Sequence, residues 1–188
     1  MTISSDPLID LTLRFALALV FAGAAISKLQ NADEFHGVVR NFRLLPRAVD
    51  GVFAFTLPWV ELALAASLVT GFGLAAASAT AAALLAVFAI AIAINIARGR
   101  TEIDCGCFRQ GLRQSLSWTL VLRNGALVAA ALWIGAELEW PRTAQVYDVV
   151  IAALAALSGL VLYLSATELT AIRRLPLRGR SIKEGWSR

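Results

Sequence analysis

The 188-residue chain is strongly apolar, with 59% hydrophobic residues, 16% charged residues and a mean hydropathy of +0.71. Soluble domains average roughly 25% charged and 45–50% apolar residues, so the composition excludes an ordinary soluble domain. The net charge of +4 is explained by anionic lipid beside one membrane face and does not require nucleic acid as a partner.

Five apolar stretches have the length of membrane-spanning helices, because about 20 helical residues cross the hydrocarbon core. No basic cluster precedes the first stretch, which is therefore expected to stay uncleaved. Only helices and closed barrels satisfy their backbone groups in lipid, and these stretches are too long for barrel strands. The expected fold is all-α, a polytopic bundle with spans at Leu8–Leu29, Val52–Thr70, Leu74–Ala97, Ser117–Gly135 and Ala144–Thr167.

Residues 30–50, between the first two spans, are polar but patterned. Apolar residues recur there at i, i+3 and i+4, with His36, Arg40 and Arg43 between them. This spacing predicts a short amphipathic helix that lies in the membrane interface and ends before Pro46. Its apolar face would consist of Phe35, Val38, Val39, Phe42 and Leu45.

Five spans place residues 30–50, the loop after the third span and the C-terminal tail on one side of the membrane. Counted with the flanking Lys28, that side has 14 of the 17 Lys and Arg residues, which predicts that it is cytoplasmic and that the N-terminus lies outside. The chain is expected to form one transmembrane domain at 1–170, with a cysteine loop at 98–116, followed by a basic tail at 171–188.

The chain has two cysteines, Cys105 and Cys107, in the sequence Asp104-Cys105-Gly106-Cys107-Phe108. Thiols at i and i+2 can close a strained disulfide, and strained, exposed disulfides are the labile, catalytic ones. Gly106 relaxes the backbone geometry that closure demands. Nearby arginines favour the thiolate, whereas Asp104 opposes it. The pair is therefore the candidate catalytic site for thiol–disulfide exchange.

Other interpretations of the two cysteines remain open. They could be incidental. The protein could also be a non-catalytic membrane subunit that either binds a soft metal such as Cu(I) through the two thiolates or scaffolds a redox assembly. A closed zinc site needs four ligands, and only His36 and Asp104 are convenient additions, so no metal site is predicted. A transporter would require a continuous polar path, but the polar residues gather in one half of the spans.

That half contains Lys28, Glu61, Asn95, Arg123 and Asn124. Ionisable groups inside a bilayer normally face the bundle interior in pairs, so Glu61 is expected to pair with Lys28 or Arg123. The pair would either lock helices together or serve as a proton relay or polar anchor for a quinone or substrate beneath the cysteine loop.

Three aromatic residues are candidates to line a cofactor pocket there, or simply to anchor the chain at the interface. His36 is either an interfacial residue or a proton carrier. The aromatic candidates are Trp59, Trp118 and Phe42.

Six segments of the sequence carry a family resemblance: 24–29, 41–46, 57–62, 93–100, 104–108 and 117–124. They resemble the MauE/DoxX family, and the last three resemble its MauE branch in particular. The resemblance spans about residues 10–136 and is strongest at Asp104–Phe108, although Arg109-Gln110 stands where the family commonly has Gly. It implies a bacterial inner-membrane protein of thiol–disulfide handling with a thioredoxin-like partner, which in the methylamine system helps to mature a disulfide-rich dehydrogenase subunit. The implied clients are periplasmic, whereas the charge count places the cysteines at the cytoplasmic face.

Overall fold

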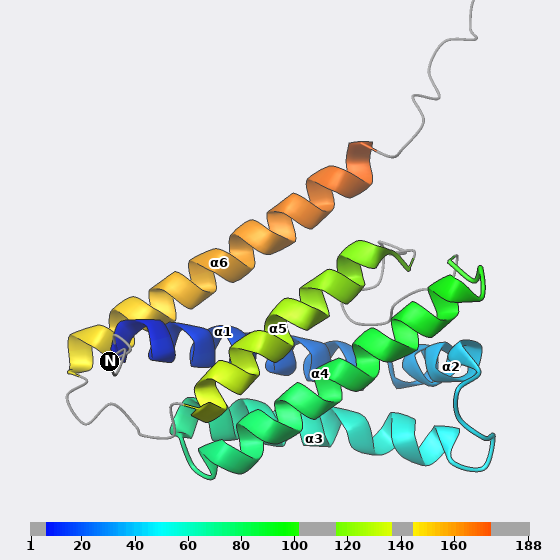
Figure 1. The fold of residues 1–188 in the computed structure, drawn as a ribbon, viewed down its shortest axis with the longest axis horizontal. Coiled ribbons are helices and arrows are strands. Elements are labelled where there is room, and N and C mark those ends of the chain that lie inside the picture. Colours follow the sequence, from blue (N-terminus) through cyan, green and yellow to red (C-terminus); the bar gives the residue numbers. More distant parts are fainter. Residues whose placement is uncertain (1–6, 102–115, 137–144, 174–188) are drawn as a thin grey trace, which may run out of the picture.

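A computed structural model describes residues 7–101, 116–136 and 145–173 (Figure 1). Every regular element in these ranges is an α-helix, and five of the helices are long and apolar enough to cross a membrane. The predicted all-α fold with five spans is thus confirmed. The helices are α1 (Pro7–Gln30), α2 (Ala32–Phe42), α3 (Asp50–Thr70), α4 (Leu74–Ala97), α5 (Trp118–Ala136) and α6 (Val146–Arg173).

Helix α1 is the centre of the bundle. It packs along α3 on one side and along α6 on another, and it also touches α2 and α5, while α4 packs mainly against α5. The core between these helices combines Phe21 of α1 and Leu68 of α3 with small residues such as Ala81 of α4. Small side chains let helix backbones approach closely, which drives helix association in lipid.

Gly135 of α5 lies close to Ser78 of α4. A Cβ atom at this position would come within 2.9 Å of the Ser78 hydroxyl oxygen and 3.6 Å of its Cβ atom. A larger residue at position 135 would therefore force Ser78 to shift.

A tight turn, Gly71-Phe72-Gly73, joins α3 to α4. Gly71 ends α3 in the left-handed conformation, with φ of 76°, and its amide donates a hydrogen bond to the Ser67 carbonyl. Gly73 also has a positive φ, of 61°. Glycine adopts this conformation without the steric penalty that other residues incur.

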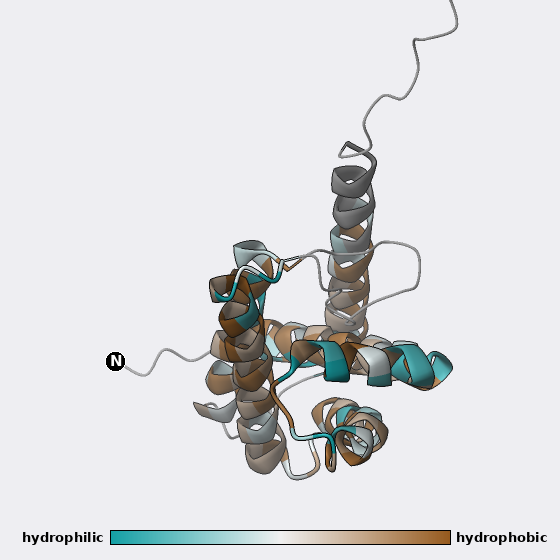
Figure 2. Cartoon of the chain, turned by 90° about the vertical axis from the view of Figure 1, so that its right-hand side faces the viewer, coloured by the Kyte–Doolittle hydropathy of each residue, from teal (hydrophilic) through white to brown (hydrophobic). Residues whose placement is uncertain are grey.

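Helix α2 lies across the end of α1 and is the most hydrophilic of the helices in Figure 2. The predicted amphipathic helix is confirmed, since its buried residues Phe35 and Val39 pack against α3. It ends at Phe42, because Arg43 adopts the left-handed conformation and its amide donates to the Arg40 carbonyl. Leu45, which the sequence pattern placed on the apolar face, therefore lies beyond the helix.

Candidate functional site

A buried ion pair joins α1 to α3. The Lys28 ammonium, in the last turn of α1, donates hydrogen bonds to both carboxylate oxygens of Glu61, at 2.7 and 2.9 Å, and a longer one to the Ala24 carbonyl at 3.4 Å. Its nitrogen also lies 5.3 Å from the ring centre of Phe35 in α2 and 5.9 Å from that of Phe88 in α4. Groups from four helices thus surround a single cation.

This arrangement satisfies the conditions under which a charged pair is tolerated in an apolar interior. Removing two charges from water is costly unless the pair is close and its hydrogen-bonding capacity is used. Lys28 engages both oxygens of Glu61, and the two aromatic rings present their negative faces to the ammonium. Of the two partners proposed for Glu61 from the sequence, Lys28 is the one observed.

Arg123 lies elsewhere, between α5 and α6. Its Nη1 donates to the Tyr163 hydroxyl at 2.6 Å, and the guanidinium carbon is 5.9 Å from the centre of that ring. Asn124, the next residue, is buried and donates to the Leu120 carbonyl of its own helix. Neither side chain is brought to Glu61, so the polar residues expected to surround one site are divided between two helix interfaces.

The ends of the cysteine loop are held together at the end of the bundle where α2 lies. The Leu116 amide donates a hydrogen bond to the Thr101 carbonyl at 2.9 Å. Leu116 is buried and packs with Ile92, and Phe42 of α2 packs against the same cluster. We call Thr101, Leu116 and this contact the loop neck. Asp104, Cys105, Gly106 and Cys107 lie between its two ends, outside the described residues.

Arg100 connects the loop neck to α2. Its Nη2 donates to the Asn41 carbonyl at 2.8 Å, and its Nη1 donates to Oδ1 of Asn95 at 3.3 Å. Asn95 is completely buried, and its own amide donates to the Ala91 carbonyl. The predicted polar residue Asn95 therefore orients the arginine that ties the base of the cysteine loop to α2.

His36 lies in α2 and faces the start of α3. Its Nε2 is 3.2 Å from Oδ1 of Asp50, and Arg40 Nε approaches the other carboxylate oxygen at 3.8 Å. His36 thus belongs to the contact between α2 and α3, where its partner is Asp50. Within the described residues, no cluster of three or more His, Cys, Asp or Glu side chains could hold a metal ion.

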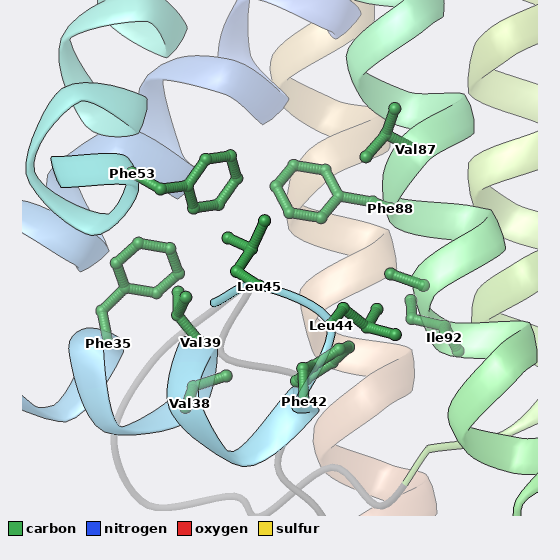
Figure 3. Close-up of a pocket in the computed structure, with 11 residues that line it drawn as sticks. Phe35, Val38, Val39, Phe42, Leu44, Leu45, Phe53, Val87, Phe88 and Ile92 are labelled. Atoms are coloured by element: carbon green, nitrogen blue, oxygen red, sulfur yellow. The ribbon is translucent and has the colours of Figure 1, made fainter. Parts of the chain in front are cut away.

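An apolar pocket of about 140 Å³ lies between α2, the segment that follows it, α3 and α4 (Figure 3). Of the three aromatic residues proposed from the sequence, only Phe42 lines it. Trp59 and Trp118 are 54% and 63% exposed and lie outside it, as expected for lipid-facing or interfacial anchors. The lining consists of Phe35, Val38, Val39, Phe42, Leu44, Leu45, Phe53, Val87, Phe88, Ala91 and Ile92.

A second buried ion pair, which we did not predict from the sequence, lies at the opposite end of α1 from Lys28. Arg14 Nη1 lies 3.3 Å from Oδ2 of Asp10, and the two side chains are 1% and 5% exposed. The sequence does contain a signal for this pair, because residues four apart on a helix lie next to each other and an Asp–Arg pair at that spacing is stabilising. Helix α1 thus carries a buried charge pair near each of its ends.

Taken together, the five long apolar helices, the buried charge pairs and the loop neck define a multi-pass helical membrane protein. The chain belongs to the MauE family: the family model described as methylamine utilisation protein MauE matches residues 6–137. Three similar proteins are each named methylamine utilization protein MauE. One from Paracoccus versutus is 49% identical over 87% of this chain and 88% of its own.

The second, from Paracoccus denitrificans, is 46% identical over 95% of this chain and 96% of its own. The third, from Methylorubrum extorquens, is 44% identical over 87% of this chain and 88% of its own. No solved structure matches the chain. The resemblance noted in the sequence is thereby confirmed at the level of the family.

Proposed function

We propose that this protein is a membrane thiol–disulfide exchange protein that uses Cys105 and Cys107. The observation that carries the proposal is the position of both cysteines within residues 102–115, a segment whose two ends are joined by the Leu116–Thr101 hydrogen bond. Arg100 ties the base of the same segment to α2. Exchange requires a pair that a partner protein can reach, and in this proposal Cys105 and Cys107 meet that need because their segment lies between the apolar spans and not within one.

The exchange step needs only the two thiols and a client disulfide. The thiolate of one cysteine attacks a client sulfur, the client S–S bond breaks, and a mixed disulfide forms while the departing client thiolate takes up a proton. The thiolate of the second cysteine then attacks the sulfur of the first cysteine in the mixed disulfide. This closes the Cys105–Cys107 disulfide and releases the other client thiol. Two electrons and two protons pass to the client, and the reverse sequence oxidises a client dithiol.

The relatives supply the context for this chemistry. They are named methylamine utilization proteins, so we place the activity in the maturation of a methylamine-oxidising system, in a bacterial inner membrane. The client would be a thioredoxin-fold protein or a disulfide-rich dehydrogenase subunit. In this proposal Lys28, Glu61 and Arg100 position the helices under the cysteine loop.

Cys105→Ser and Cys107→Ser variants test the proposal. Each is expected to insert into the membrane normally and to lose net exchange with a thioredoxin-fold partner, and the variant without the resolving thiol should accumulate a mixed disulfide. Non-reducing electrophoresis after acid quenching measures the adduct, and Ser115→Ala in the same loop is the matched control. Full exchange by either single variant, or thiols that mass spectrometry finds permanently reduced and protected by metal, would refute it.

A further inference from the structure

We infer that the pocket beside α2 binds an acyl chain of an anionic phospholipid, whose phosphate is held by Arg43 and Arg47. The pocket is open to the surroundings, because Leu44, Leu45 and Val87 line it and are each more than a third exposed. Figure 3 shows Leu45 pointing between the rings of Phe53 and Phe88. A hydrocarbon chain can therefore enter from the lipid without passing through the bundle.

The lining determines the chemistry of the occupant. Every residue that lines the pocket has a hydrocarbon side chain, and four of them are phenylalanines. An engineered apolar cavity of about 150 Å³ binds benzene, so a pocket of about 140 Å³ has room for a short length of hydrocarbon. The site thus selects an apolar group.

The lining argues against a quinone ring in this pocket. The two carbonyl oxygens of a quinone would find no donor among the lining side chains, and burying an unpaired polar group is unfavourable. Lys28 is the nearest buried cation, but it is engaged by Glu61 and lies over Phe35 and Phe88, whose rings form part of the pocket wall. A hydrocarbon chain makes no such demand.

The charge beside the pocket determines the headgroup. Arg43 precedes Leu44-Leu45 and Arg47 follows one residue after them, and both arginines are exposed. Among the described residues neither arginine has an ion-pair partner, whereas Arg40 approaches Asp50. Guanidinium groups bind phosphate through paired hydrogen bonds, and basic residues beside a membrane attract anionic lipid. One lipid can therefore satisfy the apolar pocket and the two cations together.

Native mass spectrometry of the purified full chain tests the inference, with phosphatidylglycerol and phosphatidylcholine of identical acyl chains added to detergent micelles. We expect preferential retention of phosphatidylglycerol. Each basic residue near a membrane surface contributes about fivefold in affinity, so Arg43→Gln/Arg47→Gln should lower retention by roughly 25-fold. Arg98→Gln removes an exposed charge at the end of α4 and should leave retention unchanged.

The pocket is tested separately from the charge. Ala91→Leu fills part of the lining and should reduce retention of both lipids, whereas Ala83→Leu, on the exposed side of the same helix, should not. Equal retention of the two lipids, equal loss in the Arg98 control, or displacement of phosphatidylglycerol by added ubiquinone would overturn the inference. The measurement does not involve Cys105 or Cys107, so it stands apart from the exchange proposal.

Discussion

The Lys28 ammonium contacts both carboxylate oxygens of Glu61, and the two side chains are only 3% and 2% exposed. This bidentate contact joins the last turn of α1 to the middle of α3. Because Lys28 also lies over Phe35 of α2 and Phe88 of α4, the same cation touches every helix that borders the pocket. The geometry favours a lock between helices, since Lys28 engages both Glu61 oxygens and the pair is shielded from water.

Breaking this pair on one side should destabilise the protein strongly. Lys28→Met leaves a buried carboxylate and Glu61→Leu leaves a buried ammonium, and removing one partner of a buried pair costs about 3–5 kcal/mol. The double variant removes both charges and should return most of the lost stability. Unfolding of the purified protein in mixed micelles with increasing dodecyl sulfate measures these differences.

The double variant also separates the lock from a proton relay. If the pair only fastens α1 to α3, the Lys28→Met/Glu61→Leu protein should exchange thiols at a rate near that of the wild type. A relay predicts a stable protein whose exchange is lost. We expect the first result, and a stable but inactive double variant would contradict it.

Most helix limits could be predicted from the sequence to within two residues, but α6 extends to Arg173, six residues beyond the predicted Thr167 and into the expected basic tail. The side-chain partners could not be predicted. The predicted third span, Leu74–Ala97, coincides with α4, because glycines bound it on one side and Arg98 on the other. Lys28 and Arg123 lay at compatible depths for Glu61, so helical rise could not choose between them. The choice follows from packing of α1 against α3 and of α5 against α4, which no single segment encodes.

The pocket was hard to predict for a related reason. Aromatic residues near a membrane interface have the same sequence signature whether they face lipid or a cavity. The Phe42 side chain of α2 lines the pocket, whereas Trp59 and Trp118 are exposed. Orientation depends on which helix face is buried by a neighbour, and the weak periodicity of uniformly apolar spans does not reveal that face.

Gly135→Ala should destabilise the contact between α4 and α5. The new methyl group would lie 2.9 Å from the Ser78 hydroxyl oxygen, and overpacking of this kind costs about 1–3 kcal/mol. The midpoint of unfolding in dodecyl sulfate measures the loss. Gly125→Ala in the same helix is the control, because a Cβ atom there meets nothing within 4 Å and the substitution should be neutral or stabilising.

Substitution of Ser78 tests whether overlap with its hydroxyl group causes the loss of stability in Gly135→Ala. Ser78→Ala removes the hydroxyl and leaves the Ser78 Cβ position 3.6 Å from the new methyl group, an ordinary contact. The double variant Ser78→Ala/Gly135→Ala should therefore recover most of the stability lost in Gly135→Ala. If it does not recover, the destabilisation arises from the helix backbone and not from the overlap with Ser78.

Arg100→Ala should slow exchange without unfolding the protein. It removes the hydrogen bonds to the Asn41 carbonyl and to Asn95, so the loop neck is no longer tied to α2. Displacement of reacting groups by about 1 Å can lower a rate about 100-fold, and we expect a loss of at least tenfold in net exchange. Arg98→Ala makes the same change in charge nearby, and an equal loss in that variant would attribute the effect to charge alone.

The side of the membrane that Cys105 and Cys107 face is testable by labelling. Because the sequence predicts that 14 of the 17 basic residues lie on or beside the face of the cysteine loop, both thiols should react with a membrane-impermeant maleimide in inverted vesicles and not in intact spheroplasts. A permeant maleimide should label both preparations. Ser4→Cys in a Cys105→Ser/Cys107→Ser background should give the opposite pattern at the N-terminus. Labelling of the native cysteines from the outside would invert the topology and place the pair directly before periplasmic clients.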